Sequence, residues 1–535
     1  MQMDQLMRAT AVAIAILASA LPSLAQQARQ AQQAKPLQGS ITVAFALEGK
    51  TLDPAKYSGG PDRFYLSQIY ETLIRPDPKM KSTNWLAESW SVSEVQGKPV
   101  IDVRLRKGVK FHNGYPLTAA DLEFSFNRMR DPKVSRISYA QQSVEKFEVV
   151  DPFHFRLHFN KGDAEYIAEN LTLWAMSRRY FEEVGEDEFG KNPIGTGPWK
   201  FVSRQIGTEL KLEAFEEYWN KQHRPGVKNL TIKIIPEDTT RLAAFTTGAV
   251  DWIDVVPVQA IEQLKKMPGV KTVTMRAGTN VMLTLNTHMQ NSPFRDRRVR
   301  EAVARGIDWK AIIDKVLLGQ GEQYAQIGPD DFGYDPTLKP YPYDARRASA
   351  LLREAGYPTG FDIPCYNFGT QREPNIKEAH EAAFAYLAAI GIRCKTRALE
   401  YSAWLSMARR ARAPGQPEMD GILAFTWGVG VPGDPSRPWA GHLHSYVEGT
   451  GYGQYSTANE PEMDALVKEQ NATMDRAKRL ALVKKIARLK HEQLVGGIPT
   501  YLSRVTFAWR GDKINYTPWP WMGNWREMLE IGVKQ

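Results

Sequence analysis

The feature that most constrains the fold is a strand–helix–strand unit in the second half of the chain. Two strand-like runs, GFDIPCYNF (360–368) and GIRCKTRAL (391–399), flank an amphipathic helical pattern, EPNIKEAHEAAFAYLAAIG (373–391). Within one sheet, a strand, a crossover helix and a second strand make a parallel pair with a right-handed connection. The sequence therefore predicts an α/β fold whose sheet has parallel neighbours.

The only two cysteines, Cys365 and Cys394, lie one in each of these strands. Neighbouring strands bring them within reach of each other, and exported proteins form disulfides readily. Disulfide geometry is narrow, however, so proximity alone does not decide the matter. Two interpretations stay open: a disulfide between Cys365 and Cys394, or two buried thiols.

The chain has 535 residues, too many for a single hydrophobic core, so we expect two or more lobes. Alternating patterns predict β-hairpins over 89–111, turned at Gly97, and over 147–159. Between them, Thr118 is the expected N-cap of a helix, with Asp121 at the capping-box position. The rest of the chain mixes short strands with longer helices, as α/β lobes do.

The N-terminus is typical of a secretory signal peptide. Arg8 precedes an apolar run, Ala11–Leu21, which is followed by the small-residue site SLA (23–25). The apolar run is short for a membrane span. We expect a signal peptide over 1–25, export to the periplasm, and a flexible mature N-terminus over 26–37.

Charge argues against a nucleic-acid binder. The net charge is +9, from 69 basic and 60 acidic residues, but the two signs are mixed along most of the chain. The densest basic run, RDRRVREAVAR (295–305), predicts a helix with a solvated face. Nucleic-acid binders concentrate basic residues on one stripe, so we expect no nucleic-acid partner.

Motifs for chemistry are missing. There is no G-x-S-x-G nucleophile elbow, and HEQLV (491–495) lacks the second histidine of a zinc helix. His442 and His444 are close in sequence, but no other cysteine or histidine cluster joins them. We expect no metal, no cofactor and no catalytic residue. An exported hydrolase stays open only through a site assembled in three dimensions.

Several blocks in order resemble the large, peptide/nickel-type (family 5) extracellular solute-binding proteins of bacterial ABC importers, the family of dipeptide and oligopeptide binders. The blocks are WLAESWSVSE (85–94), VRLRKGVKFHNGYPLTAADLEFSFNRM (103–129), NPIGTGPWKF (192–201), PEDTTRLAAFTTGAVDWIDVVP (236–257), LTLNTHMQNSPFRDRRVREAVARGID (283–308) and YPYDARRASALLREAGYPTGF (341–361). Together they run in family order from about Ile41 to the mid-490s.

The resemblance implies a two-lobed periplasmic-binding-protein fold (type II, large cluster C type) with an extra α/β subdomain. Solute binds between the lobes, which close around it on a hinge of two strands, and the protein hands it to the membrane subunits of an ABC permease. We expect a monomer. The implied boundaries are 38–76, 194–285 and 507–535 for a discontinuous lobe I, 77–193 for the extra subdomain, and 286–506 for lobe II.

The implied solute is a small peptide-like, conjugated or opine-like molecule, and an oligosaccharide is the alternative within the same family. In the dipeptide and oligopeptide binders, an Asp three residues after a strand-ending Trp pairs with the peptide amine. Here Trp427 is followed at that position by Gly430, and Asp434 lies in a later GDP turn. An acid before proline favours turn formation, so a structural role for Asp434 competes with ligand binding.

Four further residues complete the predicted ligand contacts. Some dipeptide binders hold the ligand carboxylate with an Arg near the position of Arg372, whose competing role is a surface pair with Glu373. Tyr57 and Ser58 occupy a turn that faces the cleft in relatives. Trp521, in the aromatic C-terminal tail, could stack on a ligand or pack in the core.

Overall fold

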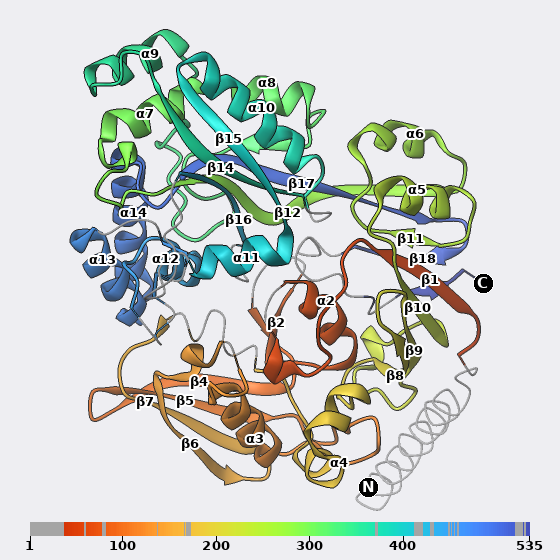
Figure 1. Cartoon of the computed structure of the whole chain (residues 1–535). Coiled ribbons are helices and arrows are strands. Elements are labelled where there is room, and N and C mark those ends of the chain that lie inside the picture. The colour runs from red at the N-terminus through yellow and green to blue at the C-terminus, as the bar shows by residue number, and fades with distance from the viewer. Residues whose placement is uncertain are drawn as a thin grey trace, which may run out of the picture. The chain divides into compact units, whose positions relative to one another are not determined.

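The longest strands of the protein, β12 (Val270–Leu285) and β17 (Ile498–Arg510), run side by side through its main sheet (Figure 1). The computed structural model describes residues 37–57, 60–77, 82–135, 137–164, 166, 173–369, 373–410, 421–428, 433–447, 450, 452–453, 455–456, 460–518, 528 and 531–534. Contacts divide the chain between Gly39 and Ser40. The description below concerns the unit that begins at Ser40.

Among the described residues the main sheet has 11 strands and is mixed, with parallel and antiparallel neighbours. Its order is β15 (Ile392–Glu400), β14 (Phe361–Gly369), β16 (Ile422–Gly428), β12, β17, β11 (Trp252–Ile253), β1 (Ser40–Phe45), β10 (Asn229–Ile234), β9 (Glu209–Ala214) and β8 (Trp199–Gln205), with β13 (Gly321–Gln323) paired to β17.

The smaller sheets lie outside this path. A four-stranded antiparallel sheet has the order β4 (Ala87–Val95), β5 (Lys98–Leu105), β7 (His154–Phe159) and β6 (Val144–Asp151). Two strand pairs join β2 (Ile74–Pro76) to β3 (Ser82–Asn84), and β18 (Ile514–Asn515) to β19 (Gly532–Val533). The hairpins predicted over 89–111 and 147–159 are therefore confirmed as β4–β5 and β6–β7.

The described helices are α2 (Gly60–Ile69), α3 (Ala119–Arg130), α4 (Arg178–Lys191), α5 (Asp238–Thr246), α6 (Ile261–Lys266), α7 (Arg297–Gly306), α8 (Trp309–Lys315), α9 (Ala345–Glu354), α10 (Ile376–Ala389), α11 (Tyr401–Arg410), α12 (Ser436–His442), α13 (Pro461–Ala472) and α14 (Arg476–Gln493). The predicted cap of α3 is confirmed, because the carboxylate of Asp121 accepts the backbone N–H of Thr118 at 2.9 Å. The basic run 295–305 forms α7, as predicted. Arg300 is buried, and its guanidinium donates to the carbonyls of Phe294, Arg295 and Gln493.

Two hydrophobic cores of the described residues pack against different strands of the main sheet. The larger is built from buried residues between Val281 and Tyr501, where α7 to α10 gather around β14, β15 and β16 (Figure 1). The smaller joins α5 and α6 to β1, β11 and the far end of β17, with Ala44 and Ala508 among its members. The long strands β12 and β17 reach both groups of neighbours, since β12 pairs with β16 at one end and β17 pairs with β11 at the other. The lobe and subdomain boundaries given above stay a prediction.

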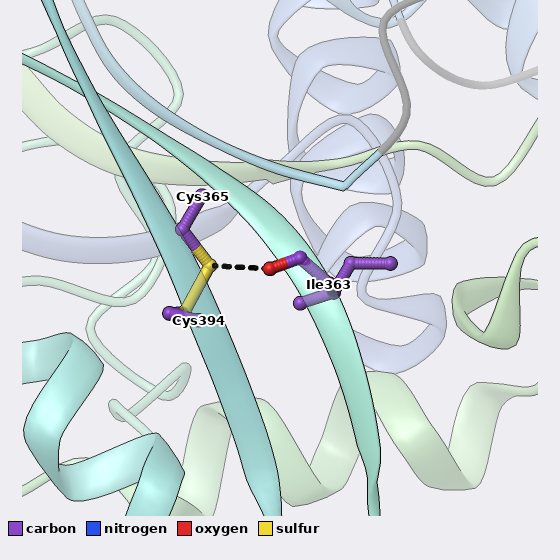
Figure 2. The surroundings of a disulfide bond; sticks show 3 residues. All are labelled: Ile363, Cys365 and Cys394. Atoms are coloured by element: carbon purple, nitrogen blue, oxygen red, sulfur yellow. Dashed lines mark hydrogen bonds between the residues drawn. A yellow bond between two sulfur atoms is a disulfide. The ribbon is translucent and has the colours of Figure 1, made fainter.

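The strand–helix–strand unit has the predicted topology. Strands β14 and β15 are parallel neighbours, and α10 connects them. Cys365 and Cys394 are joined by a disulfide across this pair (Figure 2). Of the two interpretations left open by the sequence, the structure has the disulfide.

Candidate functional site

The two long strands change register at one point. Arg276 of β12 lies opposite Arg504 of β17, and the next paired residues are Asn280 and Leu502, so β12 carries extra residues there. Gly278 lies inside this bulge with φ 67°, a left-handed conformation that favours glycine. Strands β12 and β17 connect the strands that pack on the two cores, and the bulge interrupts their pairing at this point.

An ion pair between the partly exposed Arg276 and the buried Asp331 joins the bulge to a loop of the larger core. The guanidinium of Arg276 donates from Nη1 and Nη2 to the two carboxylate oxygens of Asp331, at 3.1 and 2.7 Å. Burial raises the pKa of the Asp331 carboxyl, and the charge of Arg276 opposes that rise. The backbone N–H of Gly328 also donates to Asp331, at 2.6 Å. A side chain at Gly328 would clash with the Arg276 guanidinium, so the loop packs directly on it.

Asn280 lies against this ion pair at the end of the bulge. Its Oδ1 accepts a hydrogen bond from Nη2 of Arg276 at 3.3 Å, and its side chain is fully buried. In the register of β12 with β16, Asn280 stands directly opposite Trp427. Directly opposed residues of antiparallel strands place their side chains on the same face, so these two are neighbours.

Trp427 ends strand β16 and closes this group. It is 6% exposed and belongs to the larger core. Its ring lies near that of His442, with centroids 5.8 Å apart. Burial raises the pKa of the Tyr324 hydroxyl, and the charge of Arg276 and the nearby Trp427 indole N–H oppose that rise, although the indole N–H does not meet the geometry of a hydrogen bond. We call Arg276, Asn280, Tyr324, Asp331 and Trp427 the hinge cluster.

Asp434 has a different environment. Its Oδ1 accepts hydrogen bonds from the backbone N–H of Ser436 at 3.0 Å and from the Ser436 hydroxyl at 2.6 Å. Arg479 of α14 forms a buried ion pair with the same carboxylate. The Ser436 hydroxyl also contacts Gln470 of α13 at 2.9 Å. We call Asp434, Ser436, Gln470 and Arg479 the α12 cluster. These contacts favour the structural role of Asp434 over ligand binding.

The turn that carries Tyr57 is held by a third ion pair. Asp53 caps this turn by accepting the N–H of Ala55 at 3.0 Å, and it receives both Nη atoms of Arg128 at 2.9 and 2.8 Å. Arg128 also stacks on Phe181, with its guanidinium carbon 4.5 Å from the ring centroid. Tyr57 is 9% exposed, and the Arg63 guanidinium lies 5.3 Å from its ring centroid.

Four predicted contact residues lie outside the described residues: Ser58, Arg372, Gly430 and Trp521. Of the predicted set, the structure therefore describes Tyr57, Trp427 and Asp434. Trp427 lies in the hinge cluster, and Asp434 in the α12 cluster.

Arg276, Asn280 and Asp331 were not among the residues predicted from the sequence. One signal was available, because an arginine and a glycine interrupt the strand pattern TVTMRAGTNVMLTL (272–285). Glycine inside a strand often marks a bulge. The contact with Asp331 could not be found in this way, since it joins residues 55 positions apart.

No group of three or more metal-binding side chains occurs within the described part of the chain. A search of the same residues found no helix with the length and apolarity that crossing a bilayer requires.

Comparison with known proteins gives consistent matches. The family model "Bacterial extracellular solute-binding proteins, family 5 Middle" matches residues 81–446. Heme-binding protein A of Haemophilus influenzae is 31% identical over 80% of this chain and 80% of its own. Among solved structures, the periplasmic binding protein DppA of Helicobacter pylori, in complex with peptide STSA, has a TM-score of 0.80 at 24% identity, covering 94% of this chain and 100% of that one.

A second solved structure, AgaA from A. tumefacien R10 in complex with agropinic acid, has a TM-score of 0.78 at 23% identity and covers 93% of this chain and 99% of its own. At these identities the two structures show the fold alone. The chain therefore has the mixed α/β architecture of the two-lobed periplasmic binding proteins.

Proposed function

Because the chain belongs to the bacterial extracellular solute-binding proteins of family 5, we propose that it works in the periplasm as a receptor that closes on a peptide-like, conjugated or opine-like solute. Family membership makes the protein a solute-binding component of an ABC importer, which delivers its solute to the permease. The solute, the closure and the compartment are the parts that we propose here.

The observation that carries the closure is the bulge of β12 beside β17. Two long strands connect the neighbours of both cores, and their register changes between Arg276 and Asn280. Hinge bending at such a point lets two lobes enclose a solute that touches both of them. Enclosure removes water from the polar contacts and strengthens them.

The proposed solute follows from the loop after Trp427. The family's amine-binding acid is replaced by Gly430, and Asp434 is engaged by Arg479 and Ser436. Burying an ammonium group with no acid partner costs several kcal/mol. We therefore propose that a free peptide amine is a poor ligand, and that a blocked peptide or an opine binds better.

The test is titration calorimetry with four probes: the tetrapeptide Ser-Thr-Ser-Ala, the same peptide N-acetylated, agropinic acid and haem. We expect the acetylated peptide or agropinic acid to bind more tightly than the free peptide. Small-angle scattering of the tightest complex is expected to show compaction. Micromolar binding of the free peptide with none of the acetylated one would refute the proposed ligand class, and a complex with unchanged scattering would refute closure.

Three further measurements address the remaining parts. Mass spectrometry of a bound probe after release is expected to return it unchanged, whereas a hydrolase would return fragments. N-terminal sequencing of the protein from the periplasm is expected to begin at Gln26, which follows the small-residue site. Sedimentation of the unliganded protein is expected to give a monomer.

A further inference from the structure

Two N–H donors and an indole N–H of the hinge cluster are enclosed without an acceptor. Nε of Arg276, Nδ2 of Asn280 and Nε1 of Trp427 make no hydrogen bond within the described part of the chain. Leaving a buried donor unsatisfied has a cost of about 1–3 kcal/mol per group. Native proteins tolerate few such groups, and each calls for a physical reason.

The cluster's own contacts orient these donors. Asn280 uses its Oδ1 to accept from Arg276, so its amide nitrogen is turned away from the guanidinium. Arg276 uses both Nη atoms on Asp331, which leaves Nε as its free donor. Trp427 stands opposite Asn280 in the sheet. The three donors therefore belong to one connected group on the hinge.

The charge of the group is balanced before any solute arrives. Asp331 offsets the charge of Arg276, and its two oxygens are occupied by Arg276 and Gly328. The Tyr324 hydroxyl donates a hydrogen bond to the carbonyl of Val281 at 3.0 Å. The group thus offers three N–H donors, and a carboxylate that accepts two or three such hydrogen bonds is stabilised in its charged form.

We propose that Arg276, Asn280 and Trp427 bind a carboxylate of the solute when the lobes close around it. This inference rests on the proposed function and adds a recognition element that lies on the hinge strands themselves. A carboxylate accepts several hydrogen bonds at once, so one such group can satisfy donors from both β12 and β16. Solute recognition and hinge bending then share the same residues.

One substitution, measured with two matched peptides, tests this proposal. Asn280→Asp keeps the size and the Oδ1 acceptor of Asn280 but exchanges its N–H donor for a second anionic oxygen. We expect the dissociation constant of N-acetyl-Ser-Thr-Ser-Ala, which carries a free carboxylate, to rise about tenfold or more. The same peptide as its C-terminal amide is expected to bind the wild type weakly and to lose little more in the variant.

A second experiment measures the stability of the protein without ligand. If the donors serve a solute, replacing Trp427 by 3-benzothienylalanine exchanges the unsatisfied N–H for sulfur and keeps the bicyclic ring, so the melting temperature of the unliganded protein is expected to hold or rise. The control is Thr284→Val on the same strand, because the Thr284 hydroxyl is also buried and without an acceptor in the described residues but lies opposite Leu423, deeper in the sheet. Thr284→Val is expected to leave affinity unchanged.

The outcomes separate this inference from the proposed function. Equal affinity of wild type and Asn280→Asp for the carboxylate peptide would overturn the inference while leaving the receptor function intact. If no probe binds even the wild type, the proposed ligand class is wrong. The melting temperatures of the unliganded variants then still test the inference. A clear fall in melting temperature for the 3-benzothienylalanine variant, with no fall for Thr284→Val, would show that the indole N–H serves the fold, and the inference would be wrong.

Discussion

The hinge cluster and the α12 cluster stand on either side of residues 429–432 in the sequence, and they use buried polar groups in opposite ways. In the α12 cluster, Asp434 accepts from Ser436 and Arg479, and the Ser436 hydroxyl also contacts Gln470. In the hinge cluster, donors of Arg276, Asn280 and Trp427 have no acceptor. A polar group that is fully paired holds elements together, whereas one that is buried and unpaired weakens the fold unless a ligand pairs with it.

The largest expected effect on stability comes from removing the Arg479–Asp434 ion pair of the α12 cluster. Arg479→Met removes the cation and leaves the Asp434 carboxylate buried, with side chains that are 5% and 7% exposed in the native pair. Breaking one side of a buried ion pair typically costs 3–5 kcal/mol, so we expect a loss of about 4 kcal/mol in the free energy of unfolding. Urea denaturation followed by circular dichroism measures it.

The matched control lies on the same helix. Arg488 pairs with Asp335, but its side chain is 52% exposed. Arg488→Met is therefore expected to change stability little, because exposed ion pairs contribute little. Similar losses for Arg479→Met and Arg488→Met would contradict the view that the α12 cluster is a structural unit.

The second largest effect concerns the disulfide, which lies in the larger core and outside both clusters. Replacing Cys365 and Cys394 together by Ala removes a cross-link over a sequence separation of 29. The loop-entropy model gives a loss of about 3 kcal/mol. Affinity for the solute is expected to stay the same, which thermal unfolding and calorimetry on the same samples can check. A changed affinity would mean that β14 and β15 contribute to the site.

A third substitution, at Lys490, is expected to stabilise the fold, and the gain depends on pH. Lys490 of α14 is buried, donates to the carbonyl of Gly497 at 3.1 Å, and has its pKa lowered from 10.5 to about 7 by burial. Below about pH 7 the folded protein must keep this ammonium charged in an apolar site, so the cost is fully present there. It fades as the pH rises towards 10.5, where the unfolded chain also loses the proton.

Lys490→Met is therefore expected to raise the free energy of unfolding by about 2 kcal/mol at pH 7, with a gain that shrinks towards pH 10. Nearby His442 adds no charge at these pH values, because burial lowers its pKa to about 3. Chemical denaturation of both proteins across this range measures the difference. A gain that is the same at pH 7 and pH 10 would rule out titration of Lys490 as its cause.

The smallest effect tests whether exposed charges beside the hinge matter. Arg504, which stands opposite Arg276 in the sheet, donates to Glu322 at 3.1 Å, and both side chains are about half exposed. Glu322→Gln is expected to change stability by at most about 0.5 kcal/mol, and the change is expected to disappear in high salt. A larger effect on affinity than that of Asn280→Asp would move the important charge from the enclosed hinge cluster to the outside of the hinge.

Local signals predicted the local structure well. The period-two patterns gave the β4–β5 and β6–β7 hairpins, and Thr118 with Asp121 gave the start of α3. The strand–helix–strand pattern gave the parallel pair β14–β15. Each of these depends on residues close in sequence, where side-chain alternation and capping chemistry dominate.

Contacts between residues far apart in the chain could not be predicted from the sequence. The run 295–305 was predicted as a helix with a solvated face, but the sequence did not indicate that Arg300 donates to the carbonyl of Gln493, 193 residues away. Trp427 was identified from its strand end, but its neighbour Asn280 lies on another strand. Asp434 was visible as an acid in a turn, and only its pairing with Arg479 of α14 favours a structural role.

The sequence by itself determined the fold class, the family and the strand that carries Trp427, because these follow from periodicity and from ordered motifs along the chain. The tertiary structure alone decided which polar groups are paired. Pairing depends on which side chains meet across β12, β16 and the loop of Asp331, and those contacts exist only once the sheet has formed. For that reason a donor that finds no acceptor, such as the amide nitrogen of Asn280, becomes visible only in the folded protein.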